Sequence, residues 1–187
     1  MVAIGANFLK GKSGIGRKRL PSGHVAFLDD QKSLCLAIRD LYAYAIQSCP
    51  VKPMQAVVFR VVGESEIHAI NYKIQTLLGM DGFSANCRSF CPSAEQFHII
   101  DSEHIAHAFN RHSDGGTERR HGHIPIGVRD FELIPEVVRP KYITEFSMRG
   151  NLPRIIYGRE YGSEQLIVVQ ELRGNYGLTF KTVYRKK

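Results

Sequence analysis

The last part of the chain, residues 151–187, constrains the fold more than any other stretch. It contains three runs rich in Ile, Val, Thr, Tyr and Phe, namely RIIYGRE, EQLIVVQEL and LTFKTVYRKK. Gly158 and residues 161–163 lie around the first connection, and residues 174–177 form the second. The Gly, Asn and Ser residues of these connections are typical of short turns between strands. The pattern therefore predicts three antiparallel strands that are neighbours in one sheet.

Alternation along these strands predicts which side chains share a face, because successive side chains of a strand point to opposite faces of the sheet. On the last strand, one face is expected to carry Leu178, Phe180, Thr182 and Tyr184, and the other Thr179, Lys181, Val183 and Arg185. On the middle strand, one face is expected to carry Ile167, Val169, Glu171 and Arg173. A carboxylate, hydroxyls and cations would then meet at one end of the sheet. Such groups suit phosphate chemistry, and a solvated sheet face would show the same pattern.

Charge and cysteine content narrow the class of protein. The formal net charge of +7 favours a polyanionic partner such as nucleic acid, because clustered Lys and Arg bind phosphates with release of counterions; an acidic protein would fit as well. The four cysteines accompany neither a disulfide-rich composition nor a signal peptide, which favours a reducing cytoplasm. No apolar run approaches the roughly 18 residues of a membrane helix, so we expect a soluble protein with a substantial core and no membrane partner.

The first half of the chain divides into two regions. Residues 1–24 combine Lys and Arg with Gly and Ser and show little hydrophobic periodicity, so we expect a basic flexible arm. Residues 25–95 are expected to form an N-terminal α/β segment of unknown role, with a helix that ends before Pro50, a strand at 55–62 and a second helix at 65–79. The first helix is expected to bury one stripe of side chains, Leu34, Ile38, Leu41, Ala45 and Ile46.

Residues 96–187 are expected to form the second domain. It should open with a short strand at 96–100 and a helix whose cap lies at residues 101–102. The Gly and charged residues at 113–125 are typical of an exposed loop, and a further short helix is expected at 130–138. Together with the three C-terminal strands, these elements predict an α+β fold in which helices pack on a small antiparallel β-sheet.

The order of motifs in this second domain resembles a known family. Its first half carries His107-Ala-Phe-Asn-Arg-His112, Glu118, Ile124-Pro125-Ile126, Asp130 and Phe131, and its second half carries Tyr157-Gly158-Arg159, Glu171 and Thr182-Val183-Tyr184. This order is similar to that of the phage-associated nuclease domains grouped with barnase, EndoU, the colicin ribonucleases and RelE, the BECR domains. The resemblance implies helices on a four-stranded antiparallel sheet and RNA cleavage that needs no metal or other cofactor. Two positions depart from the family pattern, because Ser113 stands where glycine is usual and Arg159 where lysine is frequent.

The resemblance also implies an active site. The catalytic positions are His112, Arg159, Glu171, Thr182 and Tyr184. The residues expected to contact substrate are Arg119, Arg120, His121, His123, Tyr157 and Lys181. Among the catalytic positions, Thr182 and Tyr184 would donate hydrogen bonds to phosphate oxygens.

Cleavage of RNA without a metal requires a base for the 2′-hydroxyl proton, an acid for the 5′-oxygen and cations for the charge of the phosphorane, and it leaves a 2′,3′-cyclic phosphate. His112 is the candidate base or acid, because the ordinary pKa of histidine lies near the working pH. Glu171 would act as partner base or orient His112, and Arg159 would bind the phosphate bidentately without donating a proton. His121 or His123 would supply the second proton-transfer group.

Structural roles compete with each of these assignments. Thr182 and Tyr184 are common strand residues, and Glu171 would pair equally well with Arg173 or Lys181. A histidine at a helix end also favours the helix dipole.

Two other functions stay open on the sequence alone. Cys87-x3-Cys91 and His107-x4-His112 lie within the spacing range of a Cys2His2 zinc site, which would make His112 a metal ligand. A basic arm, a basic loop and an exposed sheet would alternatively bind RNA, DNA or an acidic protein without turnover.

The resemblance and the charge together predict a metal-independent endoribonuclease of the toxin or effector type, from a phage or another mobile element. Its substrate would be RNA, whether tRNA, mRNA or rRNA, in a bacterial cytoplasm. An enzyme of this kind would need an immunity or antitoxin protein, or a route of delivery to a target cell.

Overall fold

The computed structural model describes residues 25–27, 31–47, 54–60, 97–149, 152–173 and 177–187. Its strands are β1 (Val25–Phe27), β2 (Ala56–Arg60), β3 (Phe97–Asp101), β4 (His123–Ile124), β5 (Ile143–Arg149), β6 (Leu152–Tyr161), β7 (Glu164–Arg173) and β8 (Gly177–Lys186). Its helices are α1 (Gln31–Ile46), α3 (Ser102–His112), α4 (Gly115–Arg120), α5 (Val128–Glu132), α6 (Ile134–Val137) and the 3-10 helix η2 (Pro140–Tyr142).

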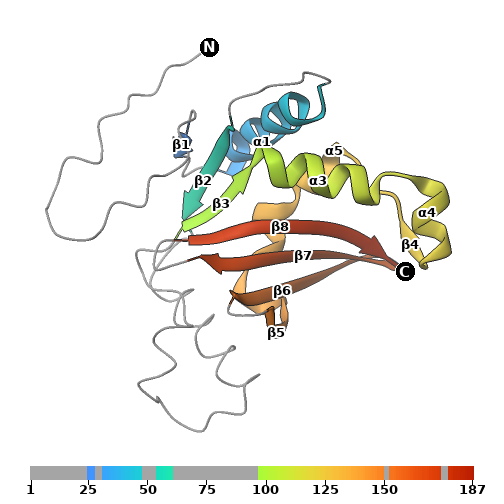
Figure 1. Cartoon of the computed structure of the whole chain (residues 1–187). Coiled ribbons are helices and arrows are strands. Elements are labelled where there is room, and N and C mark those ends of the chain that lie inside the picture. The colour runs from blue at the N-terminus through green and yellow to red at the C-terminus, as the bar shows by residue number, and fades with distance from the viewer. Residues whose placement is uncertain (1–24, 28–30, 48–53, 61–96, 150–151, 174–176) are drawn as a thin grey trace, which may run out of the picture.

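One mixed sheet holds the strands in the order β1-β2-β3-β8-β7-β6-β5, and β4 pairs with the end of β8 (Figure 1). The strands from β8 to β5 are antiparallel to their neighbours, as β2 is to β3, whereas β3 runs parallel to β8 and β1 parallel to β2. The three predicted C-terminal strands are confirmed as β6, β7 and β8, and so is the α+β class. The sheet is larger than expected because β3 pairs with β8 and brings β2 and β1 into it.

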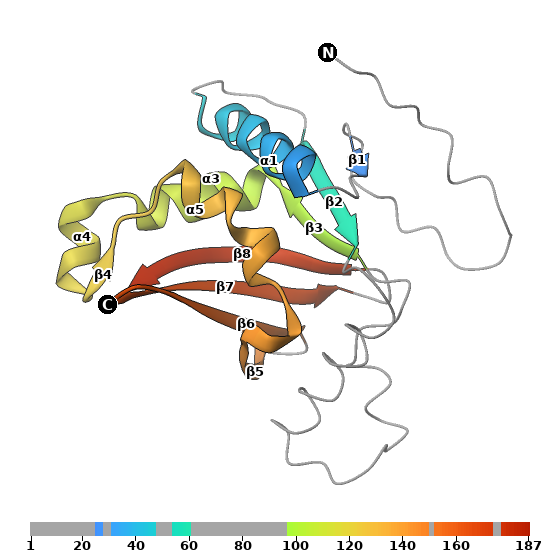
Figure 2. The same cartoon turned by 180° about the vertical axis from the view of Figure 1, so that it is seen from behind.

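Helices α1, α5 and α6 lie on one side of this sheet, and the main core is enclosed between them and the strands (Figures 1 and 2). On the strands, the buried side chains of this helix-covered face are Ile155, Tyr157, Leu166, Val168, Phe180 and Val183. The helices contribute Leu34, Ile38, Leu41, Ile105, Ala108, Phe131, Ile134 and Val137. Each large apolar side chain buried in this way stabilises the fold by roughly 1.5–3 kcal/mol relative to its exposed state. The opposite face of β6, β7 and β8, here called the outer face, carries Ile156, Gly158, Ile167, Val169, Thr182 and Tyr184.

The pairing of β7 with β8 contains a β-bulge at Lys181. Val169 pairs with Thr182, but the next residue, Gln170, pairs with Phe180, so Lys181 is an extra residue in β8. An extra residue reverses the alternation of side chains beyond it.

Because of the bulge, the two faces of β8 carry other side chains than those expected. Its outer face carries Thr179, Thr182 and Tyr184, and its helix-covered face carries Leu178, Phe180, Val183 and Arg185. The expected grouping of Leu178 and Phe180 with Thr182 and Tyr184 is therefore wrong. A prediction from strict alternation assumes that no strand contains an extra residue. On β7, Ile167, Val169 and Glu171 do share the outer face as predicted.

The first helix is confirmed as α1, with Leu34, Ile38 and Leu41 buried. Ile46 was expected on the same stripe but is 42% exposed, because it is the last residue of the helix. The predicted strands at 55–62 and 96–100 are confirmed as β2 and β3. The expected arm at 1–24 and the helix at 65–79 lie outside the described residues.

The helix α3 begins where the sequence predicts. Asp101 is its N-cap, and its carboxylate accepts a hydrogen bond from the His104 backbone N–H at 2.8 Å. The segment 113–125, expected to be a loop, contains the short helix α4 and the strand β4. The Asp114 carboxylate caps α4 by accepting a hydrogen bond from the Thr117 N–H at 2.7 Å, and β4 pairs with β8. The helix expected at 130–138 is divided into α5 and α6.

The boundary predicted at residue 95 falls within the undescribed stretch before β3. The described parts of 25–95 share the sheet and the core of the later residues, since β2 pairs with β3 and α1 packs against α3 and α5. In the described part of the chain, no helix is both long and apolar enough to cross a membrane.

A buried histidine lies in the core between two strands. His98 on β3 is fully buried, stacks on Phe59 with ring centroids 4.9 Å apart, and donates from Nδ1 to the Gln170 side-chain oxygen at 2.9 Å. Burial lowers the pKa of His98 to about 4, against the opposing effect of the hydrogen bond to Gln170. The folded protein therefore binds this proton less readily than the unfolded chain does.

Acid should destabilise the fold through this residue. Above the ordinary pKa of about 6.5, His98 is neutral in both the folded and the unfolded state, and its full contribution to the unfolding free energy is present. As pH falls from there towards 4, only the unfolded chain takes up the proton, and ~3 kcal/mol of unfolding free energy is lost. Replacing both partners, His98→Leu with Gln170→Leu, should flatten this part of the pH dependence. Urea unfolding of both proteins at about pH 7.5 and about pH 4.5 measures the difference, and equal pH dependence in the two would contradict the assignment.

Candidate active site

Two histidines, a carboxylate and the ring of Tyr184 meet at the far end of β8. β3 pairs with the start of β8 through residues 177–179, and β4 pairs with its end through residues 185–186. α3 lies along β8 between these two strands and delivers its last residue, His112, to the outer end of the strand (Figure 1). The chain then forms α4 and returns as β4, and the Ile126 N–H bonds the His112 carbonyl oxygen at 2.9 Å. This return fixes His112 and His123 next to each other.

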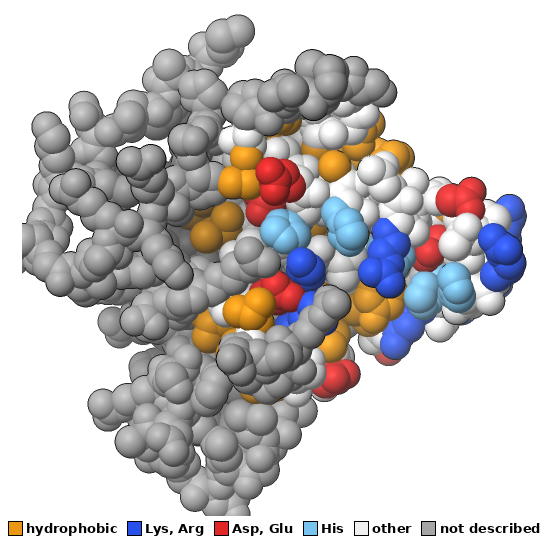
Figure 3. Space-filling view, in the orientation of Figure 1, with side chains coloured by type: hydrophobic (Ala, Val, Ile, Leu, Met, Phe, Trp, Pro, Cys, Tyr) orange, Lys and Arg blue, Asp and Glu red, His pale blue; other side chains and the backbone are white. Residues whose placement is uncertain are grey.

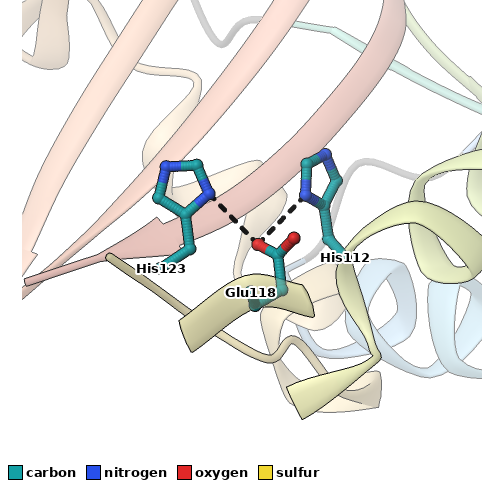
Figure 4. A group of neighbouring side chains, drawn as sticks. All are labelled: His112, Glu118 and His123. Atoms are coloured by element: carbon teal, nitrogen blue, oxygen red, sulfur yellow. Dashed lines mark hydrogen bonds and ion pairs between the residues drawn. The ribbon is translucent and has the colours of Figure 1, made fainter. Parts of the chain in front are cut away.

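Glu118 joins the two imidazoles. Its Oε2 accepts hydrogen bonds from Nδ1 of His112 at 3.2 Å and from Nδ1 of His123 at 3.1 Å (Figure 4). Since a carboxylate only accepts, each Nδ1 carries the proton and each Nε2 has a free lone pair when the ring is neutral. Figure 4 shows that the second nitrogen of each ring turns away from Glu118. One buried carboxylate therefore sets the orientation and the tautomer of both histidines.

Burial differs between the members of this cluster. Glu118 is 2% exposed and His112 is 8% exposed, whereas the side chain of His123 is 28% exposed. Burial lowers the pKa of His112, the hydrogen bond and charge of Glu118 oppose that shift, and the nearby charge of Arg111 adds to it. His112 is thus held neutral more strongly than a solvated histidine, with a lone pair on Nε2.

One side chain of the outer face, Tyr184, adjoins the imidazoles, and Thr182 lies on the same face of β8. The Tyr184 ring lies 5.7 Å from the His112 ring and 5.2 Å from the His123 ring, between centroids. Burial raises the pKa of Tyr184, so its phenol stays protonated and can donate a hydrogen bond. Thr182, two residues earlier on the same face, has a buried hydroxyl with no hydrogen-bond partner in the described part of the protein. An unpaired buried hydroxyl is uncommon and calls for a ligand or a water.

Positive charge surrounds this end of the molecule. Figure 3 shows His, Lys and Arg side chains gathered on the face seen in Figure 1. Arg111, Arg119, Arg120, His121 and Lys186 are all exposed. In the described ranges, Arg120 bonds the Gly116 carbonyl and the Thr117 hydroxyl, both at 3.3 Å, and no ion pair joins Arg111 or Arg119 to a carboxylate. Exposed cations of this kind can bind an anion.

Arg159 and Tyr157 lie on the other side of the sheet. Gly158 pairs with Ile167, which pairs with Tyr184, so the residues on either side of Gly158 point to the helix-covered face. Tyr157 is fully buried in the core. Arg159 pairs with Glu136 of α6 at 2.6 Å, and its guanidinium lies over the rings of Tyr142 and Tyr161, 5.1 and 4.9 Å from their centroids. Neither residue is brought to the His112 cluster.

Glu171 and Lys181 also lie apart from the two imidazoles. Glu171 is on the outer face but pairs with Thr179, on the other side of the bulge from Thr182. Its Oε1 accepts from Arg154 Nε at 3.0 Å and Nη2 at 2.6 Å, and Glu171 is 2% exposed. Lys181 is the half-exposed bulge residue.

The sequence pattern assigns no chemical role to Glu118, because the segment that carries it is predicted to be an exposed loop. A carboxylate placed between His112 and His123 in the sequence is the signal that could have indicated it. Of the residues in the alternative zinc set, His107 is exposed while His112 is buried, and Cys87 and Cys91 lie outside the described residues.

Comparisons with known protein families, with curated proteins and with solved structures find no match to this chain.

The tautomers of the two histidines can be measured directly. At about pH 8, where imidazoles are neutral, 15N-detected NMR correlations should show His112 and His123 protonated at Nδ1 and bare at Nε2. The exposed His107 and His121 serve as controls, because they should resemble free histidine. Glu118→Ala should shift the His112 and His123 rings towards the tautomer mixture of free histidine. An unchanged spectrum in that variant would rule out Glu118 as the orienting group.

Proposed function

We propose that this protein is a metal-independent endoribonuclease that cleaves RNA by attack of the 2′-hydroxyl and leaves a 2′,3′-cyclic phosphate. The observation that carries the proposal is the pair of hydrogen bonds from His112 and His123 to the single Glu118 oxygen. Two imidazoles with oriented, free Nε2 atoms supply the base and the acid that the reaction requires. Their ring centroids are 6.4 Å apart, which leaves room for one phosphodiester to contact both.

The roles follow from burial. His112, whose pKa is lowered by burial, takes the proton of the 2′-hydroxyl on Nε2 as the O2′–P bond forms. The more exposed His123, in its protonated form, gives a proton to the 5′-oxygen as the P–O5′ bond breaks. Glu118 stabilises the imidazolium that forms on His112, as a carboxylate does when it bonds the far nitrogen of a catalytic histidine.

Hydrogen-bond donors of the outer face and nearby cations would stabilise the negative charge of the phosphorane. The Thr182 hydroxyl and the Tyr184 phenol are donors on the outer face, and Thr182 has no competing partner in the described structure. The exposed cations Arg111, Arg119 and Arg120 would bind flanking phosphates without reading bases. In this proposal Arg159 has no part in catalysis and instead joins α6 to β6 through Glu136.

The finer family assignment is part of the same proposal. Four antiparallel strands, β5 to β8, with helices on one face, and the contact of His112 with Tyr184 support a BECR-like nuclease. We propose with it a bacterial cytoplasmic target and, for a toxin of this type, a protein that neutralises the enzyme in the cell that makes it.

The first test is cleavage of RNA in EDTA. Purified protein should cut total bacterial RNA and leave cyclic phosphate ends, and DNA of matched length should stay intact because it lacks the 2′-hydroxyl. His112→Ala and His123→Ala should each lower the rate by about 10²–10⁴-fold, as expected for loss of general acid–base catalysis. His107→Ala is the matched control on α3 and should keep the wild-type rate. Binding of RNA without any cleavage in EDTA would instead identify a binding module.

Thr182 gives a test that separates activity from stability. Thr182→Val keeps the shape of the side chain and removes a buried hydroxyl that has no partner among the described residues, so the unfolding free energy should stay the same or rise by about 1 kcal/mol. The rate of RNA cleavage should fall by about 10²-fold through loss of a donor to the phosphorane. Thr144→Val, at an exposed threonine of β5, is the control. A Thr182→Val enzyme with full activity would remove Thr182 from the site.

A further inference from the structure

We infer that His112, Glu118 and His123 also form a binding site for a zinc-like divalent cation, and that its occupancy stops RNA cleavage. The binding part of the inference stands on the geometry alone, and the inhibition part rests on the proposed function. The candidate ligands are Nδ1 of His112, Nδ1 of His123 and a carboxylate oxygen of Glu118.

The positions of these atoms suit a tetrahedral ion. The three ligand atoms lie within 4.8 Å of one another. The Nδ1 to Oε2 separations are 3.2 Å and 3.1 Å, close to the edge of about 3.3 Å between two ligands that each lie roughly 2.0–2.1 Å from zinc. Two histidines and a glutamate form a known zinc ligand set that leaves a fourth position for water or substrate. The two Nδ1 atoms are held only to within 4.8 Å of each other, so an ion that binds both would draw the two rings closer together.

The surrounding chain holds these ligands in place. His112 is at the end of α3, which is bonded to the returning chain through the Ile126 N–H. His123 is fixed by the pairing of β4 with Lys186 of β8, and α4, which carries Glu118, is capped by Asp114. A preformed set of ligands reduces the ordering that binding would otherwise require.

Ligand type limits which cations would bind. Two imidazole nitrogens with one carboxylate suit Zn²⁺, Co²⁺, Ni²⁺ or Cu²⁺, whereas Mg²⁺ and Ca²⁺ prefer sites made of oxygen atoms. The buried Glu118 carboxylate supplies one negative charge to a cation among two uncharged rings. The abundant cellular Mg²⁺ would thus leave the site open for catalysis.

Binding and catalysis would exclude each other because they use the same rings in opposite tautomers. In the catalytic arrangement the proton of each neutral ring is on Nδ1 and points to Glu118. A metal on Nδ1 leaves the single proton of each ring on Nε2, so no proton is released but the lone pair that would accept the 2′-hydroxyl proton is gone. The cation also takes the Glu118 oxygen that orients both rings.

The metal site is tested by titrating metal-free protein with Zn²⁺ and measuring the heat of binding by calorimetry. A second titration with Co²⁺ follows visible absorption, whose intensity reports tetrahedral coordination. Binding should be stoichiometric, and Glu118→Gln and the milder His123→Asn should each weaken it at least tenfold. His107→Ala and the double change Cys87→Ser with Cys91→Ser should bind like wild type. These controls separate the proposed ligands from the alternative cysteine and histidine set.

RNA cleavage is followed in the same titration. Zn²⁺ should reduce the cleavage rate in proportion to occupancy, EDTA should restore it, and Mg²⁺ should leave it unchanged. Absence of binding, or equal binding by wild type and Glu118→Gln, would overturn the metal site while cleavage in EDTA still upheld the proposed function. Binding accompanied by activation would overturn the inhibition and, with no cleavage in EDTA, the proposed function as well.

Discussion

The pairing of β8 with three other strands is the interaction on which the rest of the structure depends. One edge of β8 bonds β7 along its length, and the other edge bonds β3 at its start and β4 at its end. The gap between β3 and β4 is occupied by α3, whose buried residues Ile105 and Ala108 are part of the core and whose last residue is His112. Because α3 must span this gap, its C-terminus and the returning β4 arrive together, and the two site histidines meet.

The buried carboxylate of Glu118 is the second constraint. A charge that is 2% exposed is costly unless it is hydrogen-bonded, and the two imidazoles meet that need. The same contacts leave the outward nitrogens unpaired by protein groups in the described residues. These hydrogen bonds thus satisfy the buried carboxylate and also fix which nitrogen of each neutral ring carries the proton. On the helix-covered face of the sheet, two arginines are paired with carboxylates. Arg159 pairs with Glu136, and Arg185 pairs with Asp130 and Glu164.

Local patterns in the sequence were enough to predict most elements but not all of the site. The strands β6, β7 and β8, the helix α1 and the Asp101 cap follow from periodicity, turn residues and capping, which act over a few residues. The bulge at Lys181, the pairing of β4 with β8 and the role of Glu118 depend on contacts between distant segments. Arg159 was placed with His112 by motif order, and the strand register turns it to the helix-covered face instead. His112, His123 and Tyr184 do lie together, because β8 and α3 lie side by side.

Because of the bulge at Lys181, the number of residues in β8 decides which of its side chains face the core. Before the bulge, Leu178 and Phe180 point into the core, and after it Thr182 and Tyr184 point to the outer face although all four have even numbers. Loss of a single residue at this point would turn the two hydroxyls into the core and Val183 out of it, whereas exchange of Lys181 for another side chain would leave the parity intact. Insertions and deletions, rather than substitutions, are therefore the changes that this strand should tolerate least during evolution.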